Sequence, residues 1–252
     1  MPSFLPDTKE CRAELAQYYQ SISRLDQGIG KLVEILKSAD KYESTLIIYI
    51  SDNGVAFPGA KTTLYEPGIR LPCIVKAPGE KTGLIQDGLV SWTDITPTIL
   101  DYAGTGNVED NFHGHSFREI VESENTIGWD EVFASHTLHE VTMYYPMRMV
   151  RDKKYKLIYN IAHQLPFPFA LDLRQSPTWI STKKSDYYGK RKKEQFINRS
   201  QFELYDLEND PDELVNLAGN PAYTEILEQM KEKIKNFQKR TGDPWFYKWE
   251  FE

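Results

Sequence analysis

The most constraining stretch of the sequence is a continuous apolar run that stops abruptly at polar residues. Leu46-Ile47-Ile48-Tyr49-Ile50 is followed at once by Ser51-Asp52-Asn53-Gly54. A short run that is apolar on both faces suits a strand buried on both sides, as in the parallel sheets of α/β proteins. We therefore predict a central strand of a parallel sheet. Asp52 and Asn53 then lie at its carboxyl end, where α/β sheets bind ligands.

The segments around this strand favour an α/β layer. Residues 8–38 predict an amphipathic helix, because apolar side chains recur three or four positions apart. This stripe consists of Leu15, Tyr18, Ile22, Leu25, Ile29, Leu32, Val33 and Leu36. Downstream we expect a Gly- and Pro-rich loop over residues 54–70, a buried strand at "LPCIVKAP" and a helix at "DITPTILDYAG".

The pattern of residue types in the sequence changes after residue 130. Three runs mix aromatic, β-branched and charged residues as half-exposed antiparallel strands do: "EVFASHT", "YPMRMVRDKKYKLIYNI" and "QFELYDLEND". A helix with one apolar face is expected at about residues 221–240, and "KKSDYYGKRKKEQ" indicates a solvated loop. We therefore expect an α/β domain over residues 1–146, followed by a smaller α+β domain with an antiparallel sheet over 147–252.

Composition excludes several classes of protein. The hydrophobic fraction of 40% comes with no apolar run near the roughly 20 residues of a membrane span, which predicts a soluble chain without membrane contact. A formal charge of −7 argues against nucleic-acid binding, which usually needs a basic face. Cys11 and Cys73 have neither disulfide-framework nor zinc-site spacing.

Three residues after the central strand could bind a metal ion and an anion. Asp52 offers a carboxylate and Asn53 an amide oxygen, a combination suited to Ca²⁺ or Mg²⁺, although Asp-Asn-Gly is also an ordinary turn. Lys61 could contact a sulfate or phosphate oxygen, although a single lysine in a loop is more often a solvated surface residue. Glu66 and Arg70 could pair with each other and fix this loop.

Histidines supply the remaining candidates. In "SHTLHEVTMYYPMR", His139 and Glu140 could orient a sugar or shuttle a proton, and a hydrogen-bonded structural pair is the alternative. His113 and His115 have an HxH spacing, but without a nearby Cys or carboxylate they indicate a loop. The sequon at Asn198 permits glycosylation only in a secreted protein.

Several of these segments, in this order, resemble the distal two thirds of the type I sulfatases of the alkaline-phosphatase-like superfamily. They are "TLIIYISDNG", "GAKTTLYEPGIRLPCIV", "SWTDITPTILDYAG", "HGHS" and "FELYDLENDPDELVNLA". Within that family the chain is most similar to the heparan N-sulfatases, the N-sulfoglucosamine sulfohydrolases. "HEVTMYYPMR", "LPFPFALDLRQSPT" and "DPW" carry this finer resemblance.

The resemblance implies an activity and a set of site residues. It implies hydrolysis of N-sulfate groups of glucosamine in heparan sulfate or heparin, in the bacterial periplasm or the lysosome. Asp52 and Asn53 would be two oxygen ligands of an active-site Ca²⁺, and Lys61, where animal sulfamidases have Arg, would contact the sulfate. His139 and Glu140 would line the sugar pocket, with Asp243 a further candidate.

One departure from the family concerns the nucleophile. These sulfatases use a formylglycine made from a Cys/Ser-x-Pro-x-Arg motif, and this sequence has no such motif: Cys11 precedes Arg-Ala-Glu and Cys73 precedes Ile-Val-Lys. We therefore expect a fragment of a longer product, inactive alone, that forms a homo-oligomer or associates with the remaining amino-terminal part. The alternatives are a non-catalytic paralogue that binds sulfated glycans, and a phosphatase or phosphodiesterase of the same superfamily.

Overall fold

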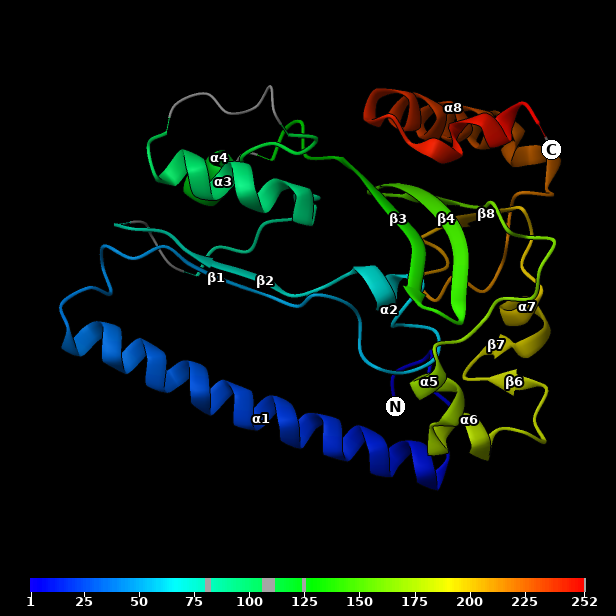
Figure 1. Ribbon diagram of the computed structural model, residues 1–252, viewed down its shortest axis with the longest axis horizontal. Helices are drawn as coiled ribbons and strands as arrows, with labels where there is room; N and C mark the ends of the chain where they lie inside the picture. Colours follow the sequence, from blue (N-terminus) through cyan, green and yellow to red (C-terminus); the bar gives the residue numbers. More distant parts are fainter. Residues whose placement is uncertain (80–82, 106–111, 124–125, 252) are drawn as a thin grey trace.

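The computed structural model describes residues 1–79, 83–105, 112–123 and 126–251. Its amino-terminal part is built around the short antiparallel strands β1 (Ile47–Ile50) and β2 (Cys73–Lys76). Figure 1 shows this pair between the long helix α1 (Lys9–Ser38) and the helices α3 (Ile95–Tyr102) and α4 (Arg118–Glu122). The short η1 (Trp92–Asp94) leads into α3.

The strand after α1 and the predicted strand at "LPCIVKAP" are both present, but the parallel direction predicted for this sheet is not found between them. β1 pairs antiparallel with β2, from Ile47 opposite Lys76 to Ile50 opposite Cys73, and its residues are half-buried. Among the described residues no parallel partner strand contacts it. An apolar run indicates which faces of a strand are buried, but it does not indicate whether the neighbouring strand is parallel or antiparallel.

A four-stranded antiparallel sheet forms the carboxyl-terminal part. The strand order is β3 (Glu131–Glu140), β4 (Met143–Asp152), β5 (Tyr155–Asn160) and β8 (Phe202–Asp206). The predicted antiparallel sheet is therefore confirmed. The expected domain boundary between residues 146 and 147 falls inside β4, and the division into two domains stays a prediction.

The two faces of this sheet carry separate cores. Alternating β4 residues Met143, Tyr145, Met147 and Met149 pack with Leu64, Tyr65 and Phe167 on one face. On the other face, Val150 and Leu157 pack with α8 (Thr224–Thr241), which contributes Leu227, Met230 and Ile234. The helix predicted at residues 221–240 is thus confirmed, with η3 (Pro221–Tyr223) before it and η4 (Pro244–Trp249) after it.

Short elements connect the two parts of the molecule. Figure 1 shows α2 (Glu66–Ile69) beside the sheet, inside the segment predicted to be only a loop. Helices α5 (Leu171–Gln175) and α6 (Pro177–Ser181) lie next to the first turns of α1. The predicted basic loop instead contains the hairpin β6 (Tyr187–Tyr188) and β7 (Arg191–Lys192), followed by α7 (Lys193–Ile197).

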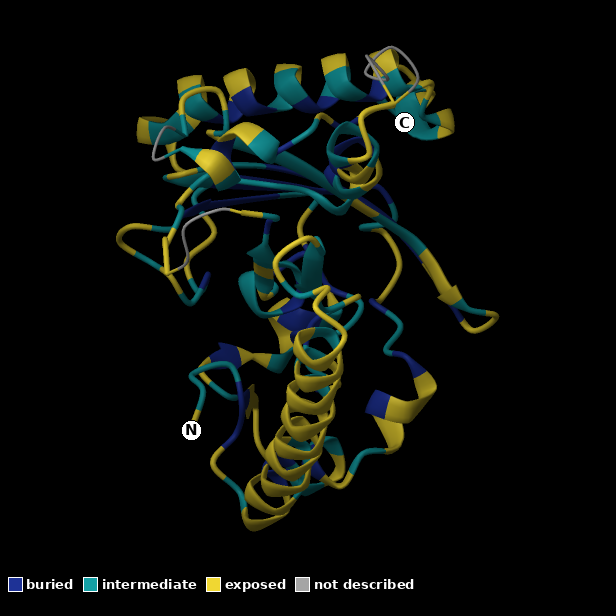
Figure 2. Cartoon of the chain, turned by 90° about the vertical axis from the view of Figure 1, so that its left-hand side faces the viewer, coloured by how far each residue is buried: buried dark blue, intermediate teal, exposed yellow. Residues whose placement is uncertain are grey.

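Burial differs strongly between the two long helices. Figure 2 shows α1 exposed along most of its length, whereas the sheet beneath α8 is largely buried. Only Cys11 and Leu15 of α1 are buried, in a small cluster with Leu5, Phe57 and Tyr188. None of the described helices has both the length and the apolar character that a membrane span requires.

Candidate functional site

The loop after β1 begins with local hydrogen bonds. The Asp52 carboxylate is exposed, and its Oδ1 accepts a bond of 2.9 Å from the backbone N–H of Asn53. The Asn53 side-chain amide donates to the Gly54 carbonyl at 2.7 Å, so its own carbonyl oxygen is available to a ligand. The indole N–H of Trp92 donates to the carbonyl of Ser51 at 2.9 Å and fixes the strand end.

Gly54 brings this strand end against α2. Its N–H donates to the Gly68 carbonyl at 3.2 Å, and a Cβ at this position would lie 2.2 Å from the carbonyl oxygen of Pro67. No side chain fits in that space, so the residue after Asn53 has to be glycine here. This close approach fixes Asp52 and Asn53 relative to α2.

The donor chemistry at this strand end suits a hard divalent cation but is incomplete. A carboxylate and an amide oxygen are typical Ca²⁺ ligands, and Ca²⁺ takes about six to eight oxygens. Within the described part of the chain, no group of three or more His, Cys, Asp or Glu side chains could hold a metal. Asp52 and Asn53 could supply two oxygens to such a cation, and this metal-binding role stays a prediction.

Lys61 lies in the same loop and pairs with a residue that the sequence did not single out. Its N–H donates to the Val55 carbonyl at 3.1 Å, and its ammonium binds Asp172 Oδ2 at 2.8 Å. Asp172 is 111 positions later, in the first turn of α5. Burial alone raises the pKa of Asp172, but the Lys61 ammonium and the Leu173 N–H outweigh it and hold the pKa below its ordinary value.

The end of β3 reaches the same turn of α5. Glu140 Oε1 accepts from the backbone N–H of Leu171 at 2.6 Å and from the Thr142 hydroxyl at 3.0 Å. His139, the preceding residue in the chain, is exposed. The β3–β4 ladder shifts register on both sides of Leu138, which turns this strand end away from regular pairing. The structure thus brings Lys61 and Glu140 to the first turn of α5, and His139 precedes Glu140 in the chain.

Asp243 lies elsewhere, between α8 and β4. Its carboxylate forms a two-oxygen ion pair with Arg148, in which Nη2 lies 2.8 Å from Oδ1. It also accepts from the Gln238 side chain at 2.9 Å and from the Trp245 N–H at 3.0 Å. Burial raises the pKa of Asp243, but these donors hold it below its ordinary value. By strand alternation, Arg148 lies on the sheet face opposite Tyr145 and Met147.

The predicted Glu66–Arg70 ion pair is wrong, because Glu66 faces the carboxyl-terminal sheet. Its Oε1 lies 2.7 Å from the Lys156 ammonium and 3.0 Å from Arg151 Nε, while Arg70 is exposed. Lys156 also binds Glu213 Oε1 at 2.8 Å. This buried cluster of Glu66, Arg151, Lys156 and Glu213 joins α2 to β4 and β5, and so fixes the loop that carries Lys61.

His136 has a structural position. Its Nδ1 lies 3.1 Å from the Tyr145 carbonyl, and burial lowers its pKa. The ring is therefore neutral at pH 7 and donates from Nδ1. This matches the hydrogen-bonded role weighed for the histidines of this segment, whereas His139 stays open to solvent.

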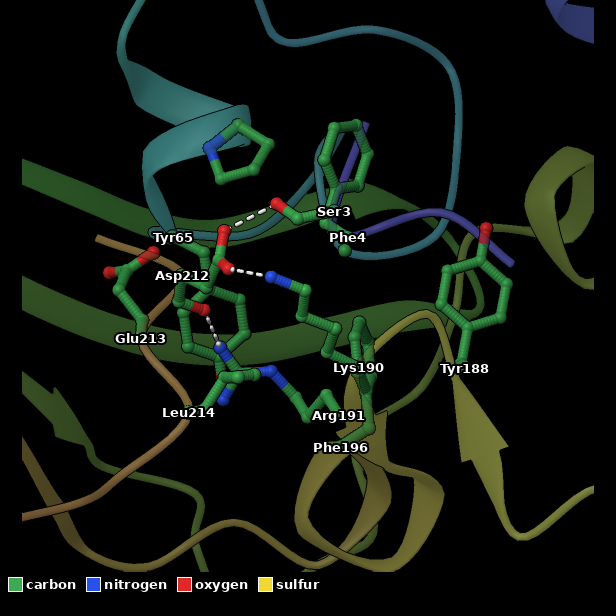
Figure 3. A pocket seen from close by; sticks show the side chains of 12 residues that line it. Ser3, Phe4, Tyr65, Tyr188, Lys190, Arg191, Phe196, Asp212, Glu213 and Leu214 are labelled. Atoms are coloured by element: carbon green, nitrogen blue, oxygen red, sulfur yellow. Dashed lines mark hydrogen bonds and ion pairs between the residues drawn. The ribbon is translucent and has the colours of Figure 1, made fainter. Parts of the chain in front are cut away.

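A small pocket lies away from these residues. Figure 3 shows it between the amino-terminal residues and the β6–β7 hairpin, where Lys190 binds Asp212 at 2.7 Å and Ser3 donates to the same carboxylate. Its volume of about 20 Å³ is that of a water site, and neither Asp52 nor Lys61 lines it. Tyr188 and Arg191 are buried here, so the prediction of a solvated loop was wrong for this hairpin.

The residues that sequence reasoning missed are the acidic and basic partners. Asp172, Arg148 and Lys156 each contact a residue far away in the sequence, and no periodicity reports such pairings. One signal was present for Asp172: it lies within "LPFPFALDLRQSPT", which already carried part of the family resemblance.

Comparison with known proteins places this arrangement in a family. The sulfatase family model matches residues 3–105, and the model described as N-sulphoglucosamine sulphohydrolase, C-terminal, matches residues 59–195 and 184–240. Human N-sulphoglucosamine sulphohydrolase is 36% identical over 97% of this chain and 51% of its own length. An ulvan-active sulfatase of Formosa agariphila is 32% identical over 90% of the chain and 44% of its own length. The chain thus spans about half the length of the curated relatives it matches.

Solved structures agree on the fold. A protein solved in complex with its substrate D-glucosamine-2-N,6-O-disulfate matches with a TM-score of 0.63 at 21% identity, covering 88% of this chain and 40% of its own. The phosphonate monoester hydrolase of Agrobacterium radiobacter matches at 0.59 and 18% identity, covering 88% and 40%. The model described as N-sulphoglucosamine sulphohydrolase, C-terminal, covers more than half of the chain, and the sulfatase model matches the part before it, so the chain belongs to this family of sulfatases.

Proposed function

We propose that this chain supplies part of the active site of a sulfatase that acts on N-sulfated glucosamine in heparan sulfate or heparin. The observation that carries the proposal is that Lys61 and Glu140 both bind the first turn of α5, with His139 next to Glu140 in the chain. Three segments distant in sequence thereby place a cation beside groups that bind sugar hydroxyls. The resemblance to human N-sulphoglucosamine sulphohydrolase supports the substrate class.

The ammonium of Lys61 would contact the sulfate. It has three donors, and Asp172 occupies one of them, so donors remain for sulfate oxygens. Asp52 and Asn53 would hold Ca²⁺ together with ligands from outside this chain, and a bound Ca²⁺ would stabilise negative charge on the sulfate oxygens. Formylglycine, the nucleophile that the family implies, would likewise come from a segment with the motif that this sequence does not contain.

The sugar would be held by the end of β3. His139 is exposed and can donate or accept, and Glu140 has carboxylate capacity beyond its bonds to Leu171 and Thr142. Asp243 would act on the sugar pocket through Arg148, which also donates to the Thr137 hydroxyl at 3.3 Å. The family resemblance also supports an extracytoplasmic location, in a bacterial periplasm or a lysosome.

A second candidate is a sulfated-glycan binding chain without turnover. The missing Cys/Ser-x-Pro-x-Arg motif favours it, whereas the Asp52, Asn53 and Lys61 set favours the enzyme. The phosphatase alternative has less support, since the match to a phosphonate hydrolase shows a shared fold alone.

The test uses the purified 252-residue chain and four small probes: glucosamine N-sulfate, glucosamine 6-sulfate, glucosamine 6-phosphate and glucosamine. We expect binding of the N-sulfated sugar by NMR titration, weaker binding of the others and no release of inorganic sulfate. Lys61→Ala should abolish the preference, while Lys153→Ala, which alters a surface pair with Asp87, should keep it. Preference for the phosphorylated sugar would contradict the proposal, and sulfate release by the chain alone would contradict its dependence on an external nucleophile.

A further inference from the structure

Asp172 is the side chain that binds the Lys61 ammonium, and both of its carboxylate oxygens accept hydrogen bonds. Asp172 Oδ1 accepts from the backbone N–H of Leu173 at 2.8 Å, and Oδ2 binds the Lys61 ammonium at 2.8 Å. Each carboxylate oxygen therefore makes a different contact. The first fixes the orientation of the carboxylate on α5, and the second directs the ammonium.

The helix that carries Asp172 is anchored on both sides. Ala170 before it and Leu173 after it are buried in the core beneath β4, and Phe167 packs in the same cluster. Glu140 binds the N–H of Leu171, so the end of β3 is attached to the same turn. The Asp172 carboxylate is thus held by packed groups, although its side chain is 54% exposed.

The Lys61 ammonium needs such a partner to be held in one position. Its backbone is fixed by the bond to Val55 and by the buried neighbours Ala60 and Thr63, but a four-carbon stem still leaves the ammonium many rotamers. Its side chain is 18% exposed. Asp172 is the acceptor that the described residues offer to this ammonium, and it selects one rotamer in advance of any ligand.

We propose that Asp172 is a positioning residue that holds the Lys61 ammonium at the first turn of α5, which Glu140 also binds, so that a sulfated amino sugar meets a preordered cation. The proposal rests on the proposed function for the identity of the ligand. Its geometric part, that Asp172 orders Lys61, stands on the contacts alone.

Simple electrostatics and positioning predict opposite results for Asp172→Asn. The variant removes a negative charge beside the site, so electrostatics alone would strengthen the binding of an anion. Asparagine also replaces one acceptor oxygen by an NH₂ donor, so one of the two contacts at 2.8 Å is lost. If Lys61 is then released, binding must order its side chain and is weakened by about two- to tenfold.

The experiment titrates glucosamine N-sulfate and inorganic sulfate into the wild-type chain, Asp172→Asn, Asp172→Glu and the matched control Asp87→Asn. Asp87 belongs to another lysine pair, with Lys153 at 3.1 Å, and its loss changes net charge equally. We expect weaker binding of both probes by Asp172→Asn, partial recovery by Asp172→Glu, and no weakening by Asp87→Asn. Binding by Asp172→Asn as tight as wild type, or tighter, would overturn the proposal.

A second readout separates this proposal from the function itself. The two Hε protons of Lys61 should be inequivalent in NMR spectra of the wild-type chain and become degenerate in Asp172→Asn, while Lys153 serves as an internal reference. If the wild-type chain binds neither probe, the proposed function fails at this site. The Lys61 signals then still decide the positioning role, because an unchanged Lys61 spectrum in Asp172→Asn would overturn it.

Discussion

Helices α1 and α8 both have an apolar stripe, but the two stripes differ in how far they are buried. Ile234 of α8 is 1% exposed because the stripe faces β4 and β5, whereas Leu32 in the α1 stripe is 63% exposed. Figure 2 shows the exposure of α1 along most of its length. The comparison teaches that periodicity predicts a helix and its apolar face, while burial requires a surface that faces it.

The strands show the same difference. Residues of β4 and β5 such as Val150 and Leu157 are fully buried, since α8 covers one face of their sheet and α5 lies on the other side. β1 and β2 are half-buried and pair only with each other among the described residues. We therefore expect the sheet part to supply most of the folding stability, and the α1 part to be available for association with a second copy or another polypeptide.

The largest expected effect is loss of the buried ion cluster that joins these parts. Lys156→Ala leaves Glu213, which burial already gives a raised pKa, without its compensating charge. We expect the free energy of unfolding to fall by about 3–5 kcal/mol in urea denaturation. Lys154→Ala, which removes an exposed pair with Glu208, is the control and should have a much smaller effect. Equal effects would show that the cluster does not stabilise the sheet part.

A matched isoleucine pair tests the helices directly. Ile234→Ala should lower the free energy of unfolding by about 2–5 kcal/mol, because it opens a cavity against the sheet. Ile35→Ala should change it by less than about 0.5 kcal/mol, because the side chain is already exposed. Sedimentation velocity on Ile35→Ala would show whether this side chain contributes to association. A large loss of stability in Ile35→Ala would mean that α1 is covered in solution.

Acid should weaken the sheet part through Asp243. Its folded-state pKa lies below the unfolded value of about 3.9, so its stabilising contribution is present above that pH and is lost as pH falls through the folded pKa. The wild-type free energy of unfolding should fall more steeply below about pH 4 than that of Asp243→Asn. Parallel pH profiles for the two proteins would exclude this contribution.

The smallest effect is expected at the end of β1. Asp52 and Asn53 would give Ca²⁺ only two oxygen side chains under the proposed function, so millimolar calcium should raise the melting temperature of this chain only slightly. Asp52→Ala should remove that shift and leave the calcium-free melting temperature unchanged. A large stabilisation by calcium would indicate a more complete site within the chain.

Much of the secondary structure could be predicted from the sequence. The helices at residues 9–38, 95–102 and 224–241, the strand at 47–50 and the carboxyl-terminal antiparallel sheet follow from local periodicity and from helix-starting and helix-ending residues. The motif order also led to the family. The parallel pairing of β1, the Glu66–Arg70 ion pair and the solvated basic loop did not follow, because each depends on the neighbours that the chain brings up from elsewhere.

The sequence by itself determined where Asp52, Asn53 and Lys61 lie along the chain, since a buried strand has to end where its apolar run ends. Only the tertiary structure decided that Lys61 pairs with Asp172 and that Glu140 accepts a hydrogen bond from Leu171. The same is true of the ion pair between Asp243 and Arg148. Periodicity acts over a few residues, whereas these contacts join positions as far as 111 residues apart and arise from packing of the whole chain.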